Sequence, residues 1–313
     1  MALSDHGRAY FIAAAFLLTS AVGLSASQLP TLEELLSPKQ LSKPPAPPLE
    51  LRVMSFNIRV ATPLDMFGHS WDQRKDDVID VIRRYRPDVC GLQEALKHQI
   101  DAIMGGLSGY GLIGVGRDDG KTAGEYSCIL YRKDRFEVSS GDTFWLSDKP
   151  EEPGSKSWGM FTRICTWGRF IDKDTGRAFY LYNTHLDSAS SFARERGAAL
   201  LLERFAARPY DDPVILTGDL NAGENNRVIQ YLKGQTLLGD ELSPIPLVDT
   251  FRVIHPNERQ AGTTGGYRGA RGHNKIDYIL TEPRVEVLDA QIIREHGRSS
   301  DHYPITATIV LNG

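Results

Sequence analysis

Residues 213–221 read Pro213-Val214-Ile215-Leu216-Thr217-Gly218-Asp219-Leu220-Asn221, and the expected fold is organised around them. The apolar run at 214–216 is typical of a buried strand, which ends near Gly218. Asp219 and Asn221 follow two residues apart, at the edge of a sheet where clefts form. These side chains fit either an Asx-type turn or a site that handles metal, water or phosphate. The other strand ends of the chain decide between the two interpretations.

The length and charge of the chain limit its class. A chain of 313 residues is long enough for one large α/β domain or two small ones. Its formal net charge of −4 provides no overall positive field that would attract a polyanion. This argues weakly against a dedicated nucleic-acid-binding protein, although a local basic cleft stays compatible with the composition.

The first 26 residues resemble a secretory signal peptide. Arg8 precedes a short apolar run at 10–18, and small residues follow it up to an expected cleavage near Ala26. The apolar run is too short for a comfortable membrane span. We therefore expect a secreted protein with no stable membrane span after cleavage. An uncleaved N-terminal membrane anchor and an N-terminal helix without a targeting role are the alternatives.

Residues 27–49 are expected to be a linker, because the prolines at 44–48 favour an extended spacer. No repeat or second low-complexity tract follows, so residues 50–313 are expected to form one domain. Three cysteines, Cys90, Cys128 and Cys165, lie in apolar contexts without metal-binding spacing. They are interpreted as buried free cysteines that act as small apolar residues.

Strands and helices alternate along this domain. Helices are expected at 71–85, up to about 104, and at 191–207, from apolar residues on one face. Strands are expected at 51–56, 87–94, 275–280, 285–293 and from 305 to about 311, with two β-pairs, 127–131 with 135–145 and 164–171 with 178–182. Many short strands with few helices indicate a layered α/β or α+β sandwich.

Five expected strand ends carry polar residues that can bind metal or phosphate. They are Asn57; Glu94; His185 with Asp187; Asp219 with Asn221; and Asp301 with His302. Asp277 adds a carboxylate within an otherwise apolar strand. Each residue alone has a structural explanation, such as a helix cap or an edge-strand charge. Five strand ends of this kind in one domain favour a common site.

The order and local sequence of six segments resemble the endonuclease/exonuclease/phosphatase superfamily, over about residues 50–311. The resemblance implies the deoxyribonuclease-I-like fold, a four-layer α/β sandwich of two packed mixed β-sheets flanked by helices. Further phrases at 116–120 and 143–147 resemble a bacterial and fungal subgroup whose substrates are mostly unassigned. The six segments are Ser55-Phe56-Asn57-Ile58-Arg59, Gly91-Leu92-Gln93-Glu94, Asn183-Thr184-His185-Leu186-Asp187, Thr217-Gly218-Asp219-Leu220-Asn221, Lys275-Ile276-Asp277-Tyr278-Ile279 and Ser300-Asp301-His302-Tyr303-Pro304.

The resemblance implies a Mg²⁺-dependent phosphoesterase that hydrolyses a phosphomonoester or phosphodiester by metal-assisted attack of water. A hard divalent ion held by carboxylate oxygen stabilises negative charge on phosphate oxygens. Glu94 is the implied principal Mg²⁺ ligand, with Asn57 beside it and Asp301 near the same centre. Mn²⁺ is a possible substitute for Mg²⁺.

The resemblance also assigns catalytic roles. Asp219 would orient or deprotonate the attacking water, while Asn221 and His185 would donate to phosphate oxygens. His302 is the second catalytic histidine, and Asp277 would accept a hydrogen bond from its other ring nitrogen. A carboxylate that fixes the orientation and charge of a histidine suits it to stabilise a phosphoryl transition state.

Three basic residues are expected to contact the substrate. Arg163 is an unexpected cation on a strand, and Lys275 and Arg271 belong to a Gly-, Arg- and Thr-rich segment at 255–275, expected to be a mobile loop. Asp187 is either a supporting residue of the site or a structural one. Abasic-site endonucleases of the superfamily carry Asp at the position of Arg59, so neither their metal arrangement nor their DNA-repair role is carried over.

The expected partner is a phosphoester, either a small molecule or a nucleic acid, and a monomer is expected. A secreted nuclease that cleaves DNA or RNA is one alternative function. A non-catalytic protein of the same fold that binds a phosphate ligand is the alternative from another class.

Overall fold

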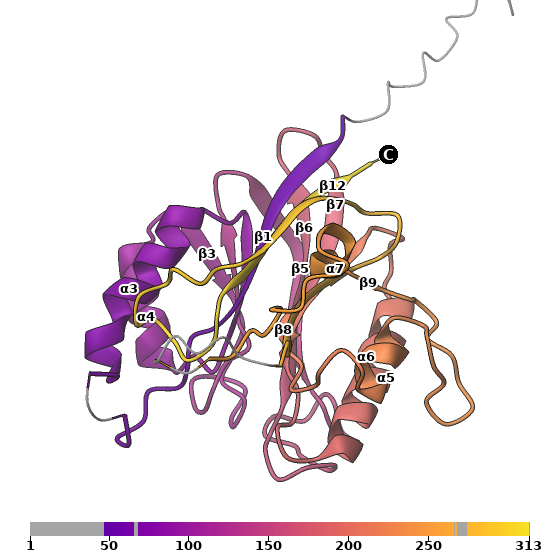
Figure 1. The fold of residues 1–313 in the computed structure, drawn as a ribbon, viewed down its shortest axis with the longest axis horizontal. Helices are drawn as coiled ribbons and strands as arrows, with labels where there is room; N and C mark the ends of the chain where they lie inside the picture. The colour runs from indigo at the N-terminus through magenta and orange to yellow at the C-terminus, as the bar shows by residue number, and fades with distance from the viewer. Residues whose placement is uncertain (1–46, 66–67, 266, 268–273, 313) are drawn as a thin grey trace, which may run out of the picture. The chain divides into compact units, whose positions relative to one another are not determined.

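Two six-stranded sheets pack face to face in the computed structural model, which describes residues 47–65, 68–265, 267 and 274–312 (Figure 1). The first sheet has the order β11-β12-β1-β2-β4-β3, and the second has the order β5-β6-β7-β8-β10-β9. Both sheets mix parallel and antiparallel pairs. The expected signal peptide at 1–26 and nearly all of the linker at 27–49 lie outside the described residues and stay predictions.

The first sheet consists of β1 (Leu49–Asn57), β2 (Val89–Gln93), β3 (Tyr110–Ile113), β4 (Ile129–Arg132), β11 (Glu286–Ile292) and β12 (Ile305–Leu311). The second consists of β5 (Phe136–Trp145), β6 (Ile164–Asp172), β7 (Ala178–His185), β8 (Val214–Asp219), β9 (Val248–Asp249) and β10 (Asp277–Thr281). The helices are α3 (Trp71–Tyr85), α4 (Lys97–Gly106), α5 (Ser191–Ala206), α6 (Arg227–Leu232) and α7 (Thr250–Ile254).

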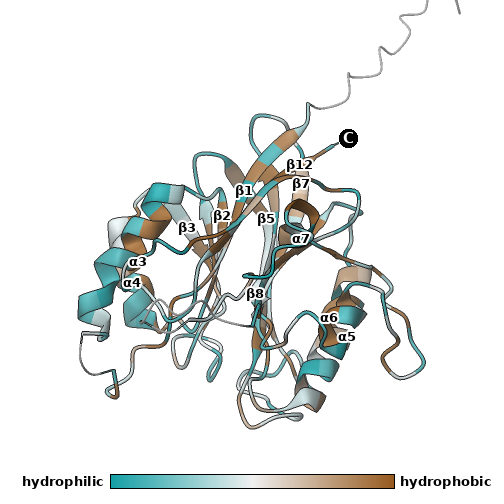
Figure 2. Cartoon of the chain, viewed as in Figure 1, coloured by the Kyte–Doolittle hydropathy of each residue, from teal (hydrophilic) through white to brown (hydrophobic). Residues whose placement is uncertain are grey.

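Four helices cover the outer faces of the two sheets. Helices α3 and α4 lie on one side and α5 and α6 on the other, with the sheets between them (Figure 1). Both α3 and α5 carry hydrophobic and hydrophilic residues on different faces (Figure 2). The described residues thus form the four-layer α/β sandwich predicted from the sequence.

Alternating side chains of the central strands fill different hydrophobic layers. Along β1, Leu51 and Val53 face the layer between the sheets, whereas Met54 and Phe56 face α3 and α4. Strand side chains alternate between the two faces of a sheet, so a strand covered on both sides needs apolar residues at nearly every position. This explains the continuous apolar runs that identify the central strands in the sequence.

The central strands end at one edge of the sandwich. Strands β1 and β2 are parallel, as are β7 and β8, while β12 and β10 run antiparallel beside β1 and β8. β1 contacts β8 and β10 across the core, and β2 contacts β7. The carboxyl ends of four strands and the amino ends of β10 and β12 therefore meet at this edge.

One expected β-pair is wrong. The segments 127–131 and 135–145 were expected to pair with each other, yet β4 pairs with β2 and β3, whereas β5 pairs with β6 in the other sheet. The chain passes from one sheet to the other at residues 133–135. A short polar connection suits a hairpin and a crossing between sheets equally, so the local sequence does not separate them.

Some of the remaining helices and strands lie where the sequence predicts them, and others were not predicted. The pair β6–β7, helix α3 and helix α5 lie where the sequence predicts them. The short elements β3, β9, α6 and α7 were not predicted, because a few residues carry too little periodicity. Among the described residues, no helix has the length and apolar character needed to cross a membrane.

Gly91 of β2 offers a test of how closely the two sheets approach. A Cβ at this position would lie 2.3 Å from Asn183 Oδ1 and 2.3 Å from Thr217 Oγ1, both in the second sheet. We expect Gly91→Ala to lower the free energy of unfolding by about 1–3 kcal/mol, because well-packed atoms must move apart. Urea unfolding followed by circular dichroism measures this change.

Gly105→Ala is the matched control for that prediction. Gly105 lies in α4 and nothing lies within 4 Å of an added Cβ. The same substitution there should leave stability unchanged or raise it by up to about 1 kcal/mol, because Ala is the better helix former. Equal effects of the two substitutions would contradict the close approach at Gly91.

Candidate active site

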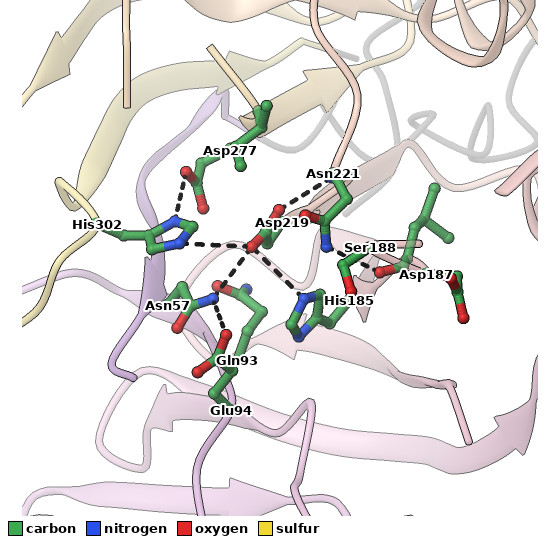
Figure 3. Close-up of polar contacts among 12 residues, drawn as sticks. Asn57, Gln93, Glu94, His185, Asp187, Ser188, Asp219, Asn221, Asp277 and His302 are labelled. Carbon is green, nitrogen blue, oxygen red and sulfur yellow. Dashed lines mark hydrogen bonds and ion pairs between the residues drawn. The ribbon is translucent and has the colours of Figure 1, made fainter. Parts of the chain in front are cut away.

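Polar side chains from both sheets gather at the edge where the central strands end (Figure 3). Asn57 ends β1, Glu94 follows β2, His185 ends β7 and Asp219 ends β8. Asp277 begins β10 directly opposite Asp219 in the ladder, and His302 precedes β12. Seven of the predicted catalytic and metal-binding residues occupy this edge, namely Asn57, Glu94, His185, Asp219, Asn221, Asp277 and His302.

Asp219 lies at the centre of this arrangement. Its Oδ2 accepts a hydrogen bond from Asn57 Nδ2 at 3.1 Å and lies 3.5 Å from His185 Nε2 and 3.8 Å from His302 Nε2. Its Oδ1 accepts a hydrogen bond from the main-chain N–H of Asn221. Burial and the nearby carboxylate of Asp277 raise the pKa of Asp219 to about 7. Near neutral pH this carboxylate can therefore both accept and release a proton.

Asn57 joins Asp219 to Glu94. Its Nδ2 donates to Glu94 Oε1 at 2.9 Å as well as to Asp219, and the main-chain N–H of Val60 donates to Glu94 Oε2. Glu94 has a φ of 62°, a left-handed conformation that non-glycine residues rarely adopt. The side-chain nitrogen of Asn57 thus faces Glu94. The role of Asn57 as a metal ligand stays a prediction.

His302 and the buried Asp277 form a pair. His302 Nδ1 lies 3.0 Å from Asp277 Oδ2, within hydrogen-bond distance. Burial opposes a charge on the ring, but the carboxylates of Asp277, Asp219 and Asp301 outweigh it and raise the pKa of His302 to about 10. His302 is accordingly a cation at neutral pH, with its Nε2 directed towards Asp219.

His185 is in the opposite protonation state. Burial and the positive charges of Arg163, His302 and Arg117 hold its pKa well below the usual range, so the ring is neutral. Its Nδ1 is buried and has no hydrogen-bond partner among the residues that the structure describes. The site therefore combines one neutral and one charged imidazole on either side of Asp219.

The loop after β8 and the loop after β7 support each other. Asn221 has a φ of 48°, and its Nδ2 donates to the main-chain oxygen of Leu186 at 3.0 Å. Asp187 is buried, and its Oδ1 accepts from the main-chain N–H groups of Ala189 and Ser190, just before α5. These contacts give Asp187 a structural role in the loop that carries His185.

Asp301 is paired with a basic residue, whereas the sequence predicts it near the metal ion. Its Oδ2 forms a 2.7 Å ion pair with Arg59 Nη1, and its Oδ1 accepts a hydrogen bond from Ser300 Oγ. The guanidinium of Arg59 also pairs with Asp65 at 2.7 Å. The sequence singled out Arg59 as a departure from some relatives, but gave no signal for this pairing.

The three predicted substrate contacts have different positions. Arg163 is buried beside His185, with its guanidinium over the ring of Phe161 and near Ser188. Lys275 is also buried, but its Nζ donates to Asp249 at 2.7 Å and lies 3.5 Å from the centre of the Tyr278 ring. Its ammonium is thus used inside the protein, which corrects the expectation that it contacts substrate. Arg271 lies outside the described residues.

A small hollow lies next to His185. Arg117 and Arg163 line it together with Glu125, which accepts a hydrogen bond from Arg117 at 2.7 Å. The sequence gave no reason to select Glu125. A larger cavity of about 830 Å³ lies between α5 and the segment at 147–158, and it contains none of the predicted site residues.

The donor set of the site fits a hard divalent ion. Glu94, His185 and Asp219 each bring a ligand atom within 4.8 Å of the others. Carboxylate oxygens are the ligands that Mg²⁺ prefers, and few protein ligands suffice because the ion keeps several waters. A second group, Asp219 with Asp277 and His302, already contains the positive charge of His302. Glu94 is therefore the better position for a metal.

A family model described as the Endonuclease/Exonuclease/phosphatase family matches residues 54–302, which include every residue of this edge. The chain belongs to the endonuclease/exonuclease/phosphatase family. The matched range contains the strand-end residues that the sequence singled out. The chain is accordingly a phosphoesterase-family member with a candidate metal site, as the resemblance implied.

Solved structures of the family agree over the whole domain. The chain is 32% identical to an endonuclease/exonuclease/phosphatase from Bacteroides vulgatus, with a TM-score of 0.74 over 84% of this chain and 100% of that one. It is also 32% identical to a mannosyl-6-phosphatase from Bacteroides thetaiotaomicron, with a TM-score of 0.74 over 83% of this chain and 100% of that one.

Similarity to curated proteins is more limited. The chain is 27% identical to an uncharacterized protein of Acanthamoeba polyphaga mimivirus over 166 residues, which cover 50% of this chain and 61% of that protein. The chain thus spans less than two thirds of this curated relative. This similarity leaves the substrate open.

The pair of Asp277 and His302 predicts a specific titration. We expect Asp277→Asn to lower the pKa of His302 from about 10 towards its ordinary value of about 6.5, because the facing negative charge is lost. Ring chemical shifts followed by NMR between pH 5 and 11 in metal-free protein measure it. Asp76→Asn, at an exposed position of α3, is the control.

The same pair sets a pH dependence of stability. The folded protein binds the His302 proton more tightly than the unfolded chain, so the stabilisation is complete below about pH 6.5 and is lost as the pH rises towards 10. Asp277→Asn should remove this loss between pH 7 and 10, as measured by denaturant unfolding. An unchanged pKa in the variant would show that Asp277 does not hold the charge.

Proposed function

We propose that the chain is a divalent-metal-dependent phosphatase that hydrolyses phosphomonoesters of sugars. Hydrolysis is supported by the position of Asp219 Oδ2. This oxygen accepts a hydrogen bond from Asn57 and lies close to the ring nitrogens of His185 and His302. The sugar is suggested by the Bacteroides thetaiotaomicron mannosyl-6-phosphatase, which matches this chain over its own full length.

Glu94 and its neighbours would hold the ion. The carboxylate of Glu94 is fixed by Asn57 and by the main chain of Val60, and its remaining lone pairs are available to a cation. When bound, Mg²⁺ would reduce the cost of negative charge on the phosphate oxygens. The left-handed backbone at Glu94 keeps the carboxylate at this position.

Asp219 is the proposed general base. Its pKa of about 7 suits proton transfer at neutral pH, where a base must be deprotonated and still accept a proton. As the water oxygen bonds to phosphorus, its proton passes to Asp219. The bond between phosphorus and the ester oxygen then breaks, the leaving sugar oxygen takes up a proton from solvent water, and Asp219 releases its proton to solvent.

The two histidines would stabilise the phosphoryl group in different ways. The charged His302, oriented by Asp277, places a positive charge near the developing negative charge. The neutral His185 can donate a hydrogen bond to a phosphate oxygen, and the amide of Asn221 has one remaining N–H for another. Arg163 supplies a buried positive charge behind His185.

A panel of substrates tests the proposed activity. Mannose 6-phosphate, glucose 6-phosphate, bis(p-nitrophenyl) phosphate, single-stranded DNA and RNA would be incubated with Mg²⁺, with and without a chelator. We expect phosphate release from the hexose phosphates, lost with the chelator. Faster cleavage of a diester or of a nucleic acid would contradict the phosphatase, and metal-dependent binding without turnover would indicate the non-catalytic alternative.

Substitution of Glu94 tests the site itself. We expect Glu94→Gln to lower kcat for the best substrate by about 100-fold or more, because the negative charge that would hold the ion is removed. Glu137→Gln is the matched control, since Glu137 lies exposed on β5. Full activity of Glu94→Gln, with an unchanged dependence on Mg²⁺, would rule out Glu94 as the metal position.

A further inference from the structure

Arg59 occupies a position between two carboxylates at the metal side of the site. Its Nη1 donates to Asp301 Oδ2 at 2.7 Å, while its Nη2 and Nε donate to Asp65 Oδ1 at 2.7 and 3.0 Å. The side chain of Asp65 is only 2% exposed, and those of Arg59 and Asp301 are 31% and 27% exposed. The guanidinium thus neutralises a carboxylate that sequence analysis assigned to the metal.

The backbone of Arg59 is fixed on both sides. Its φ of 60° is in the left-handed region, and its N–H donates to Asn57 Oδ1 at 2.9 Å. Its carbonyl oxygen accepts from Gln99 Nε2 at 3.0 Å and from the fully buried Arg74 at 3.2 Å. Because the main chain and Asp65 both hold it, the guanidinium is ordered before any ligand arrives.

Asp301 lies outside the groups that could bind a metal. Within the part of the chain that the structure describes, those groups are Glu94 with His185 and Asp219, and Asp219 with Asp277 and His302. Two-metal phosphoesterases hold their second ion with further carboxylates, about 4 Å from the first ion. A divalent ion at Asp301 would meet the positive charge of Arg59 at short range, which disfavours it.

We propose that the guanidinium of Arg59 takes the place of a second divalent ion, so that the chain binds a single metal ion, at Glu94. In this arrangement Asp301 is the ion-paired partner of Arg59 and not a metal ligand. This proposal rests on the proposed function, which requires a metal ion at Glu94. Arg59 is then the residue that determines how many divalent metal ions bind.

Counting bound metal ions tests this inference without any activity assay. Mn²⁺ would be titrated into chelator-treated protein, with free Mn²⁺ measured by electron paramagnetic resonance. We expect one ion for the wild type and for Arg59→Lys, which keeps the positive charge. We expect two for Arg59→Gly, which accepts the left-handed backbone and frees the carboxylates of Asp65 and Asp301.

Two further variants complete the test. Asp301→Asn should bind one ion with an affinity within about twofold of the wild type, since no ligand is lost. Arg132→Ala is the matched control, because Arg132 also contacts two carboxylates, Asp88 at 3.4 Å and Asp134 at 2.5 Å. This control should not gain an ion, because Asp88 also pairs with Arg135 at 2.8 Å and stays ion-paired in the variant.

The outcomes separate this inference from the proposed function. Two ions in the wild type, or one ion in a folded Arg59→Gly variant, would overturn the role of Arg59. A loss of affinity of about tenfold or more in Asp301→Asn would show that Asp301 is a ligand, and this arm remains decisive if Arg59→Gly does not fold. No bound ion in the wild type would overturn the metal-dependent function itself.

Discussion

A single buried carboxamide fixes the two sheets against each other. Asn183 of β7 donates to the main-chain oxygens of Leu92 and Cys128 in the first sheet, and its own oxygen accepts from Gln93 and Thr217. Nearly all its hydrogen-bonding capacity is used inside the core, where an unpaired polar group would be costly. Because Gln93 precedes Glu94 and Asn183 lies two residues before His185, this contact aligns the half of the site that would bind metal with the half that would bind phosphate.

The acids of the site differ in the positive charge that each one faces. Asp277 faces the cation of His302, Asp301 faces Arg59, and Glu94 is the position best suited to a metal ion. Asp219 lies among them with no cation of its own within 3 Å, and burial raises its pKa to about 7. This division of charge leaves Asp219 as the carboxylate whose pKa suits the exchange of a proton near neutral pH.

The sequence predicts the strand ends well because each combines two strong signals, an apolar run and a polar residue that ends it. Asn57, Glu94, His185 and Asp219 were found in this way, and the fold brings them together. Lys275 was misassigned, since a basic residue in a Gly-rich segment gives no sign of a buried partner such as Asp249, 26 residues away. The sheet crossing after β4 and the pairing of Arg59 with Asp301 also depend on contacts between distant segments, which local patterns do not encode.

The pairing of β1 with β12 joins the two ends of the folded domain, from Leu49 opposite Leu311 to Ser55 opposite Ile305. His302 lies three residues before the start of β12, and Asn57 lies at the end of β1. During synthesis the site therefore cannot assemble until residue 302 has been added and the last strand has returned to the first. Such long-range closure is a slow step in folding. Until β12 has paired with β1, His302 is not held beside Asp219, and the site lacks its charged imidazole.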